Sequence, residues 1–121
     1  MSGGGKAEAA SVTVGGITLT TQILAGVSGK DLPPMIDEMK AAGNTGIMIL
    51  AAEGEGKAAV AVGAGSAAAG KVSAVDVLRA VTAALGGKGG GGRPDLAQGG
   101  APSLADFEAA IAAAKAVMEG K

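Results

Sequence analysis

The chain has 121 residues, a length that suits one domain with a substantial core. Its formal net charge of −1 provides no overall attraction for a polyanion. It contains no histidine, no cysteine and a single aromatic residue, Phe107, which excludes imidazole and thiolate chemistry, disulfides, most zinc sites and the stacking of bases on aromatic side chains.

The N-terminal part of the chain is predicted to contain a leader followed by paired strands. Residues 1–11 are small and polar, so we interpret them as a flexible leader or boundary before a single globular domain over residues 12–121. From Val12 to Ile23, apolar residues alternate with polar or small ones across Gly15 and Gly16. This period of two predicts a half-buried strand or a hairpin.

A helix is expected next, from a cap at Ser28 or Asp31 to about Ala42. The prolines at positions 33 and 34 are compatible with its first turn, and Gly43 ends it. Its apolar residues share one face, which we interpret as core rather than as a partner groove. They are Leu32, Met35, Ile36 and Met39.

Two neighbouring strands are predicted in the middle of the chain. The continuous apolar run Ile47–Ala51 is typical of a strand covered on both faces, and Ala58–Val62 returns as its partner. Glu53 and Glu55 lie between them on a glycine-spaced turn with no third ligand nearby. We therefore interpret these carboxylates as solvated turn residues rather than as an acid–base pair or a metal site.

Two further helices are predicted, one on each side of a glycine-rich stretch. Ser73 begins the first helix with a capping-box-like signal, and Ser103 begins the second. The first helix carries a buried stripe made of Val77, Leu78, Val81 and Leu85. The second carries a narrower stripe that serves either the core or a dimer, made of Leu104, Phe107, Ile111, Ala114 and Met118.

The stretch Gly86–Gly100 reads GGKGGGGRPDLAQGG, and two interpretations of it compete. Its glycines allow backbone N–H groups to approach a phosphate or a sugar, with Lys88 and Arg93 adding positive charge. The alternative is a flexible tether between two helices. The stretch is not a Walker loop, because no Ser or Thr follows the lysine, and a helix precedes it where a dinucleotide motif needs a strand.

The order of the predicted elements indicates a fold that mixes strands and helices, of the α/β (α+β) class. It is a small β-sheet with helices packed on it and a glycine-rich loop between the last two helices. Arg79 lies on the outer face of the helix before this loop, as ordinary solvated charge or as part of a basic rim with Lys71 and Lys88. Because no apolar run is long enough to span a bilayer and no signal peptide is apparent, we expect a cytoplasmic domain.

The glycine stretch with its RPDLAQ continuation resembles a known family signature. It is similar to the GGKGGGRPDMAQ-type motif of the C-terminal domain of bacterial alanyl-tRNA synthetases, the DHHA1-type module called C-Ala. The resemblance extends upstream through KDLPPMIDEMK and GIMILAAEGEGKAAVAVG and covers the chain from about Val14 to Met118. The glycine run is one residue longer than the usual pattern, and Leu96 stands where methionine is usual, a volume-conserving replacement.

This resemblance implies a domain that binds the tRNA elbow and helps the aminoacylation and editing centres of the full synthetase share one tRNA. It is not expected to be an enzyme by itself, because the chain offers neither an ATP site nor a zinc-binding editing cluster. The implied partners are tRNA and the remaining synthetase domains, with a homodimer through the last helix also considered. We expect no cofactor, no metal and no membrane partner.

The resemblance also implies a set of contact residues. Cations and backbone N–H groups are expected to meet phosphates, and the amide of Gln98 to meet sugars or base edges. The expected nucleic-acid contacts are Lys71, Arg79, Lys88, Gly89, Gly90, Gly91, Gly92, Arg93 and Gln98. Pro94 and Asp95 are expected to support the loop, with Asp95 pairing with Arg93 or capping N–H groups.

Two other functions compete with tRNA binding. The same module occurs in DHH-type phosphoesterases, where it binds the substrate's nucleotide, but the glycines there are typically followed by histidine, which this chain lacks. A dimerisation module using the last helix is the other alternative.

Overall fold

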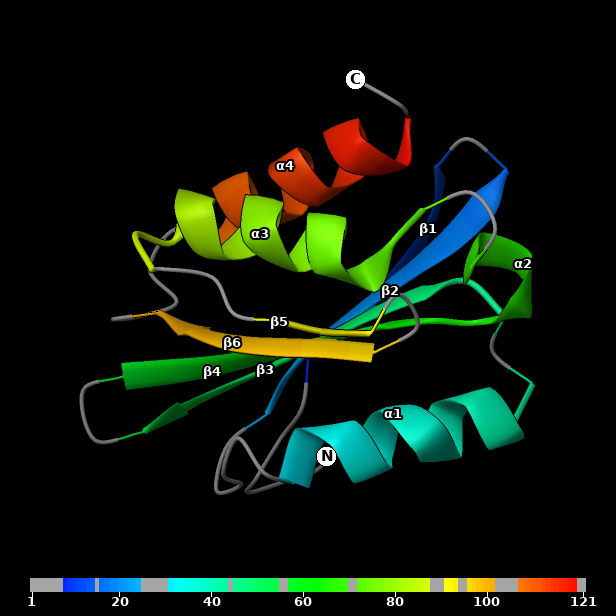
Figure 1. Cartoon of the computed structure of the whole chain (residues 1–121), viewed down its shortest axis with the longest axis horizontal. Helices are drawn as coiled ribbons and strands as arrows, with labels where there is room; N and C mark the ends of the chain where they lie inside the picture. The colour runs from blue at the N-terminus through cyan, green and yellow to red at the C-terminus, as the bar shows by residue number, and fades with distance from the viewer. Residues whose placement is uncertain are drawn as a thin grey trace.

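The structure is a computed structural model that describes residues 8–14, 16–24, 31–43, 45–54, 57–69, 72–87, 91–93, 96–101 and 107–119. Its centre is a six-stranded sheet with the strand order β1-β2-β3-β4-β6-β5. Helix α1 covers one face of this sheet, and α3 and α4 cover the other (Figure 1). This arrangement confirms the predicted α+β class, with helices packed on a sheet.

The first two strands form the predicted hairpin. Strands β1 (Glu8–Val14) and β2 (Ile17–Leu24) pair antiparallel, and Gly16 lies in the turn between them with φ +84°. Strand β1 begins at Glu8, whose backbone pairs with Ile23. The sheet therefore includes the backbone of residues 8–11, which the sequence placed in the leader.

Helix α1 (Leu32–Ala41) forms where it was predicted. Leu32 and Ile36 are fully buried, and the two methionines of the same face pack at the edge of their cluster. Gly43 ends the helix at φ +104°, a left-handed conformation that glycine adopts without strain. Asp31 occupies the N-cap position, but its side chain makes no capping hydrogen bond, so the predicted cap is wrong in that respect.

The central strands are β3 (Ile47–Gly54) and β4 (Lys57–Ala64), which pair antiparallel as predicted. Strand β3 also pairs parallel with β2, so α1 is the crossover between two parallel neighbours. Ile47 and Ile49 face the α3–α4 side, whereas Met48 and Leu50 face α1. Because both faces of β3 are covered, its sequence is apolar without alternation.

Helix α3 (Ala74–Ala84) follows the short helix α2 (Ser66–Ala69). The hydroxyl of Ser73 accepts a 3.2 Å hydrogen bond from the backbone N–H of Val75, which confirms the predicted cap. The predicted stripe is buried along its whole length, at Val77, Leu78, Val81 and Leu85.

Two strands that the sequence did not predict lie between α3 and α4. They are β5 (Gly91–Arg93) and β6 (Leu96–Ala101), and β6 pairs with β4 from Ala58↔Ala101 to Gly63↔Leu96. The expectation of a loop is wrong for these residues. Because glycine has low strand propensity, the sequence of β6 carries no local signal for a strand. The hydrogen bonds that make it a strand come from β4, which is distant in the sequence.

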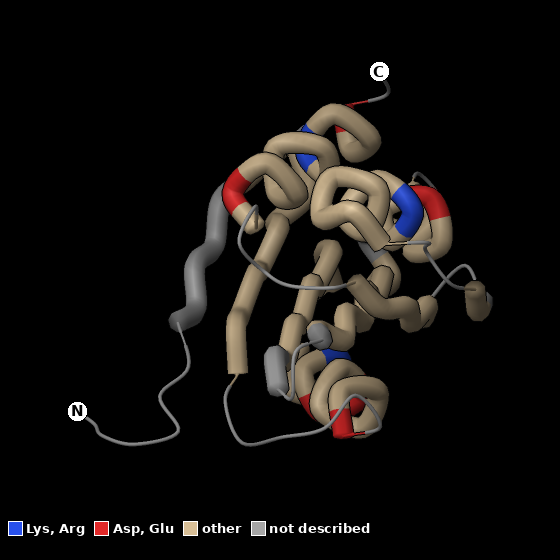
Figure 2. Tube along the Cα trace, turned by 90° about the vertical axis from the view of Figure 1, so that its left-hand side faces the viewer, with Lys and Arg blue, Asp and Glu red and all other residues tan. Residues whose placement is uncertain are grey.

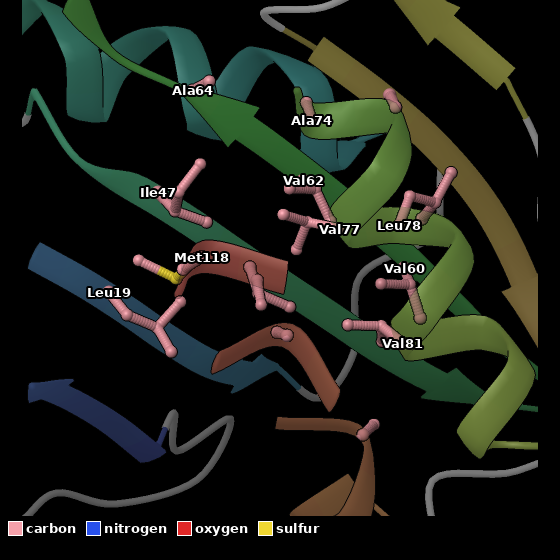
Figure 3. Packing of buried hydrophobic residues seen from close by; sticks show 14 of the residues in the cluster. Leu19, Ile47, Val60, Val62, Ala64, Ala74, Val77, Leu78, Val81 and Met118 are labelled. Atoms are coloured by element: carbon pink, nitrogen blue, oxygen red, sulfur yellow. The ribbon is translucent and has the colours of Figure 1, made fainter. Parts of the chain in front are cut away.

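Helix α4 (Phe107–Met118) packs beside α3, over the sheet. Ala110, Ala114 and Met118 are buried, and Phe107 and Ile111 lie at the edge of the same cluster. Figure 3 shows Met118 in one core with Leu19, Ile47, Val77 and other residues of the sheet and α3. The stripe thus serves the core within the described residues, which do not include Leu104.

Candidate nucleic-acid interface

The structure places part of the predicted site on one hairpin at the edge of the sheet. Gly91, Gly92 and the backbone of Arg93 form β5, and Gln98 lies in β6 directly opposite Gly91. Arg79 is exposed on α3, which contacts both strands. The remaining predicted residues lie outside the described part of the chain; they are Lys71, Lys88, Gly89, Gly90, Pro94 and Asp95.

Strand β5 is the last strand in the sheet order, so one of its sides has no strand partner among the described residues. An edge strand presents backbone N–H and C=O groups to its surroundings. Gly91 and Gly92 are both exposed, and neither has a side chain that covers its backbone. The edge therefore offers hydrogen-bonding groups that a phosphate or sugar can approach closely.

Other glycines of the stretch have structural roles. A Cβ atom at Gly87 would overlap the carbonyl oxygen of Gly100 and lie 2.8 Å from Cα of Ala101. A Cβ atom at Gly92 would overlap the carbonyl oxygen of Leu96 and lie 2.7 Å from Cα of Ala97. Glycine at positions 87 and 92 lets the chain lie directly against β6, a requirement that the sequence did not reveal.

The C-terminal end of α3 sets the direction in which this stretch begins. Gly86 adopts φ +82°, and its N–H donates to the carbonyl of Ala83 at 3.2 Å. The N–H of Gly87 donates to the carbonyl of Thr82 at 2.7 Å. These two bonds form a Schellman motif, which satisfies carbonyl groups at the helix end. The first two glycines are therefore part of a helix cap rather than of a tether.

Gln98 and Arg79 lie on opposite sides of the sheet. Gln98 pairs with Ala61, which belongs to the cluster under α1, whereas its neighbour Ala97 pairs with Val62 under α3. Directly opposed residues of an antiparallel pair share a face, so Gln98 faces the α1 side. Arg79 belongs to a helix on the other side. A ligand that touches both has to reach around the β5 edge.

Residues 16–120 match the DHHA1 domain family. The chain belongs to this family. It is 52% identical to the alanine–tRNA ligase of Dinoroseobacter shibae and 54% identical to that of Jannaschia sp., over 99% of this chain and 14% of each ligase. It also matches the crystal structure of the C-Ala domain from Aquifex aeolicus alanyl-tRNA synthetase, with a TM-score of 0.83 and 30% identity over 92% of this chain and 99% of that one.

These matches confirm the resemblance inferred from the glycine stretch and RPDLAQ. The DHHA1 domain spans about 14% of the length of the curated ligases it matches, so it corresponds to an accessory domain and not to the whole ligase. Among its described residues, no cluster of His, Cys, Asp and Glu side chains is suited to a metal ion. None of the helices in that part of the domain is long and apolar enough to cross a bilayer.

The charges on the described helices of the DHHA1 domain are mainly negative. Figure 2 marks acidic and basic positions along the traces of α1, α3 and α4. The acidic residues are Asp37, Glu38, Asp76 and Glu108, with Asp31 and Glu119 directly beside helix ends, and the basic ones are Lys40, Arg79 and Lys115. Most cations of the chain lie in the other segments, including Lys71, Lys88 and Arg93. Except around Arg79, the helical surfaces are therefore poor candidates for phosphate binding.

Proposed function

We propose that this DHHA1 domain binds tRNA as an accessory domain of an alanyl-tRNA synthetase and contacts the tRNA elbow through the β5–β6 hairpin. The observation that carries the proposal is the edge strand Gly91–Arg93, whose two exposed glycines leave the backbone open to a ligand. The relatives support tRNA as the ligand, since they are alanine–tRNA ligases and a domain of an alanyl-tRNA synthetase.

The hairpin suits a ligand that is recognised by shape. The elbow is built from stacked loops and backbone, and a side-chain-free strand edge can follow such a surface without aromatic platforms. Lys88 lies within the glycine run and Arg93 directly follows it, and both neutralise phosphates. Lys71 and Arg79 are further cations of the site. Gln98 meets sugars or base edges, while Pro94 and Asp95 keep the supporting role expected from the resemblance.

In the full synthetase the domain performs no catalysis of its own. It holds one tRNA so that the aminoacylation and editing centres of the other domains, in the cytoplasm, act on it in turn. Because few cations are available, the affinity is modest and its dependence on salt is shallow. A slope that required many ion contacts would contradict this mode of binding.

The test is a fluorescence anisotropy titration of the domain with folded tRNA, with tRNA that lacks its D- and T-loops, and with duplex DNA. The wild type is expected to prefer intact tRNA, and Arg93→Ala is expected to weaken that binding by about tenfold to a hundredfold, the effect of removing a hydrogen bond to a charged group. Lys115→Ala on α4 is the matched control, with an unchanged affinity. Equal weak binding to all three nucleic acids would refute elbow recognition.

A dimer through α4 has less support. The buried residues of that helix already pack within the chain, which leaves Phe107 and Ile111 as half-buried apolar residues at its edge. Light scattering measures the size of the protein in solution, and a strict monomer is expected here. A monomer would remove the main support for a dimerisation function, whereas the preference for intact tRNA is measured by the titration.

A further inference from the structure

Methionine is the only readily oxidised residue type in this chain, which has five methionines but no cysteine, histidine, tryptophan or tyrosine. Among the four described methionines, Met48 and Met118 are buried in the core, with exposed fractions of 0% and 6%. Met35 and Met39 are half-buried and lie one turn apart on the apolar face of α1. Because oxidation follows exposure, a hydroperoxide reaches the sulfur atoms of Met35 and Met39 more readily than those in the core.

Helix α1 depends on its packing against the sheet. It has 10 residues, and its N-cap residue makes no side-chain capping hydrogen bond. So short a helix is not stable by itself in water, and its stability comes from the tertiary contacts of its apolar face. Those contacts are made by the fully buried Leu32 and Ile36 and by the two methionines at the edge of the cluster. Two of these four side chains are therefore open to oxidation.

Oxidation changes the chemistry of such a contact. One oxygen atom passes from the peroxide to the thioether sulfur, so that an S–O bond forms, the O–O bond breaks, and the peroxide is reduced to water. The sulfoxide is polar and accepts hydrogen bonds, so it favours water over an apolar cluster. A sulfoxide at Met35 or Met39 therefore weakens the packing of α1 on the sheet.

The cluster under α1 also supports the β5–β6 hairpin. Ile36 lies so close to β4 that a Cβ atom at Gly63 would overlap its Cγ2. Gly63 pairs with Leu96 of β6, and Leu96 packs against the same cluster as the two methionines. Leu96 in turn pairs with Arg93 of β5. A loosened α1 therefore removes packing from the hairpin at Leu96.

We propose that Met35 and Met39 form an oxidation-sensitive site, at which a hydroperoxide produces sulfoxides that loosen α1 and the hairpin and thereby weaken RNA binding. The effect on binding rests on the proposed function, whereas the site of oxidation and its effect on the fold do not. The change is reversible, because methionine sulfoxide reductases restore the thioether.

The test treats the domain with hydrogen peroxide and compares the wild type with Met35→Leu/Met39→Leu and with Met118→Leu. Leucine conserves the volume of methionine, so the untreated variants are expected to bind tRNA as the wild type does. The double variant retains Met1, Met48 and Met118 and thus shows the effect of oxidation at the other methionines. Peptide mass spectrometry measures the oxidation of each methionine, and hydrogen exchange measures the protection of α1 and β6.

In the wild type, Met35 and Met39 are expected to oxidise about tenfold or more faster than Met48 and Met118. The oxidised protein melts about 3–6 °C lower, and the backbone N–H groups of α1 and β6 exchange faster. Its affinity for tRNA falls about threefold, because a smaller fraction of the molecules has an ordered hairpin. Sulfoxide reductases restore all three properties.

The two variants are expected to separate after peroxide treatment. The double variant keeps its melting temperature, its hydrogen exchange and its tRNA affinity, because its α1 has no thioether. Met118→Leu remains as sensitive as the wild type, because it retains both methionines of α1.

Four results would overturn the proposal. The first is equal oxidation of the four described methionines. The second is an unchanged melting temperature and hydrogen exchange once Met35 and Met39 are oxidised, and the third is an unchanged tRNA affinity. The fourth is a double variant that loses stability and affinity on oxidation as the wild type does. An untreated wild type that does not prefer folded tRNA over duplex DNA would refute the proposed function, and oxidation rates and hydrogen exchange would still decide whether the site exists.

Discussion

The backbone N–H of Gly87 donates a 2.7 Å hydrogen bond to the carbonyl oxygen of Thr82, and this bond determines where the glycine stretch leaves α3. On its other side Gly87 lies against Gly100 and Ala101 of β6. A helix end and a strand therefore meet at a residue that has no Cβ atom. The stretch that looks most flexible in the sequence begins at a constrained point.

Gly87→Ala is expected to lower the free energy of unfolding by about 1–3 kcal/mol, because the new methyl group overlaps backbone atoms of β6. Urea unfolding followed by circular dichroism measures this loss. Gly91→Ala is the matched control, and its effect should stay within about 0.5 kcal/mol because the space around it is open. Equal stability of the two variants would contradict the close contact at Gly87.

Gly63→Ala is expected to disturb the contact between β4 and α1, because a Cβ atom there overlaps Cγ2 of the buried Ile36. The expected loss is about 1–3 kcal/mol by overpacking. Ile36→Leu conserves volume but removes the Cγ2 branch, so in the double variant it should relieve the overlap by about 1 kcal/mol. A double-mutant cycle in urea measures the coupling, and strictly additive effects would show that the two residues do not oppose each other.

Ser73→Ala is expected to cost about 1 kcal/mol, because it removes the acceptor for the N–H of Val75 at the start of α3. Thermal unfolding measures the effect. Ser73→Asp keeps a capping oxygen and adds a negative charge at the helix N-terminus, so its stability should equal or exceed that of the wild type. Loss of stability in both variants would point to a role of Ser73 other than capping.

Arg79→Ala tests whether the exposed cation of α3 belongs to the tRNA site. If it contacts one phosphate, tRNA affinity falls and the slope of log K against log salt decreases in magnitude by about 1. Lys115→Ala on α4 removes the same charge and should leave both quantities unchanged. Indistinguishable binding by the two variants would leave Arg79 as ordinary solvated charge.

Local patterns predicted a large part of the fold. The β1–β2 hairpin, the apolar face of α1, the run Ile47–Ala51 and the Ser73 cap each depend on residues close together in the chain, and each is confirmed. The RPDLAQ continuation identified the family. The RNA contacts inferred from it stay predictions, including those of Lys71, Lys88 and Arg93.

The sequence by itself determined which segments become the three long helices and the central strands, because periodicity and capping are properties of neighbouring residues. Only the tertiary structure decided that Leu96–Ala101 is a strand, since its hydrogen bonds come from β4, more than 30 residues earlier. The same pairing puts Gln98 on the α1 side, away from Arg79. It also distinguishes Gly87 and Gly92, which lie against β6, from the open Gly91, because a glycine's role depends on what surrounds it in space.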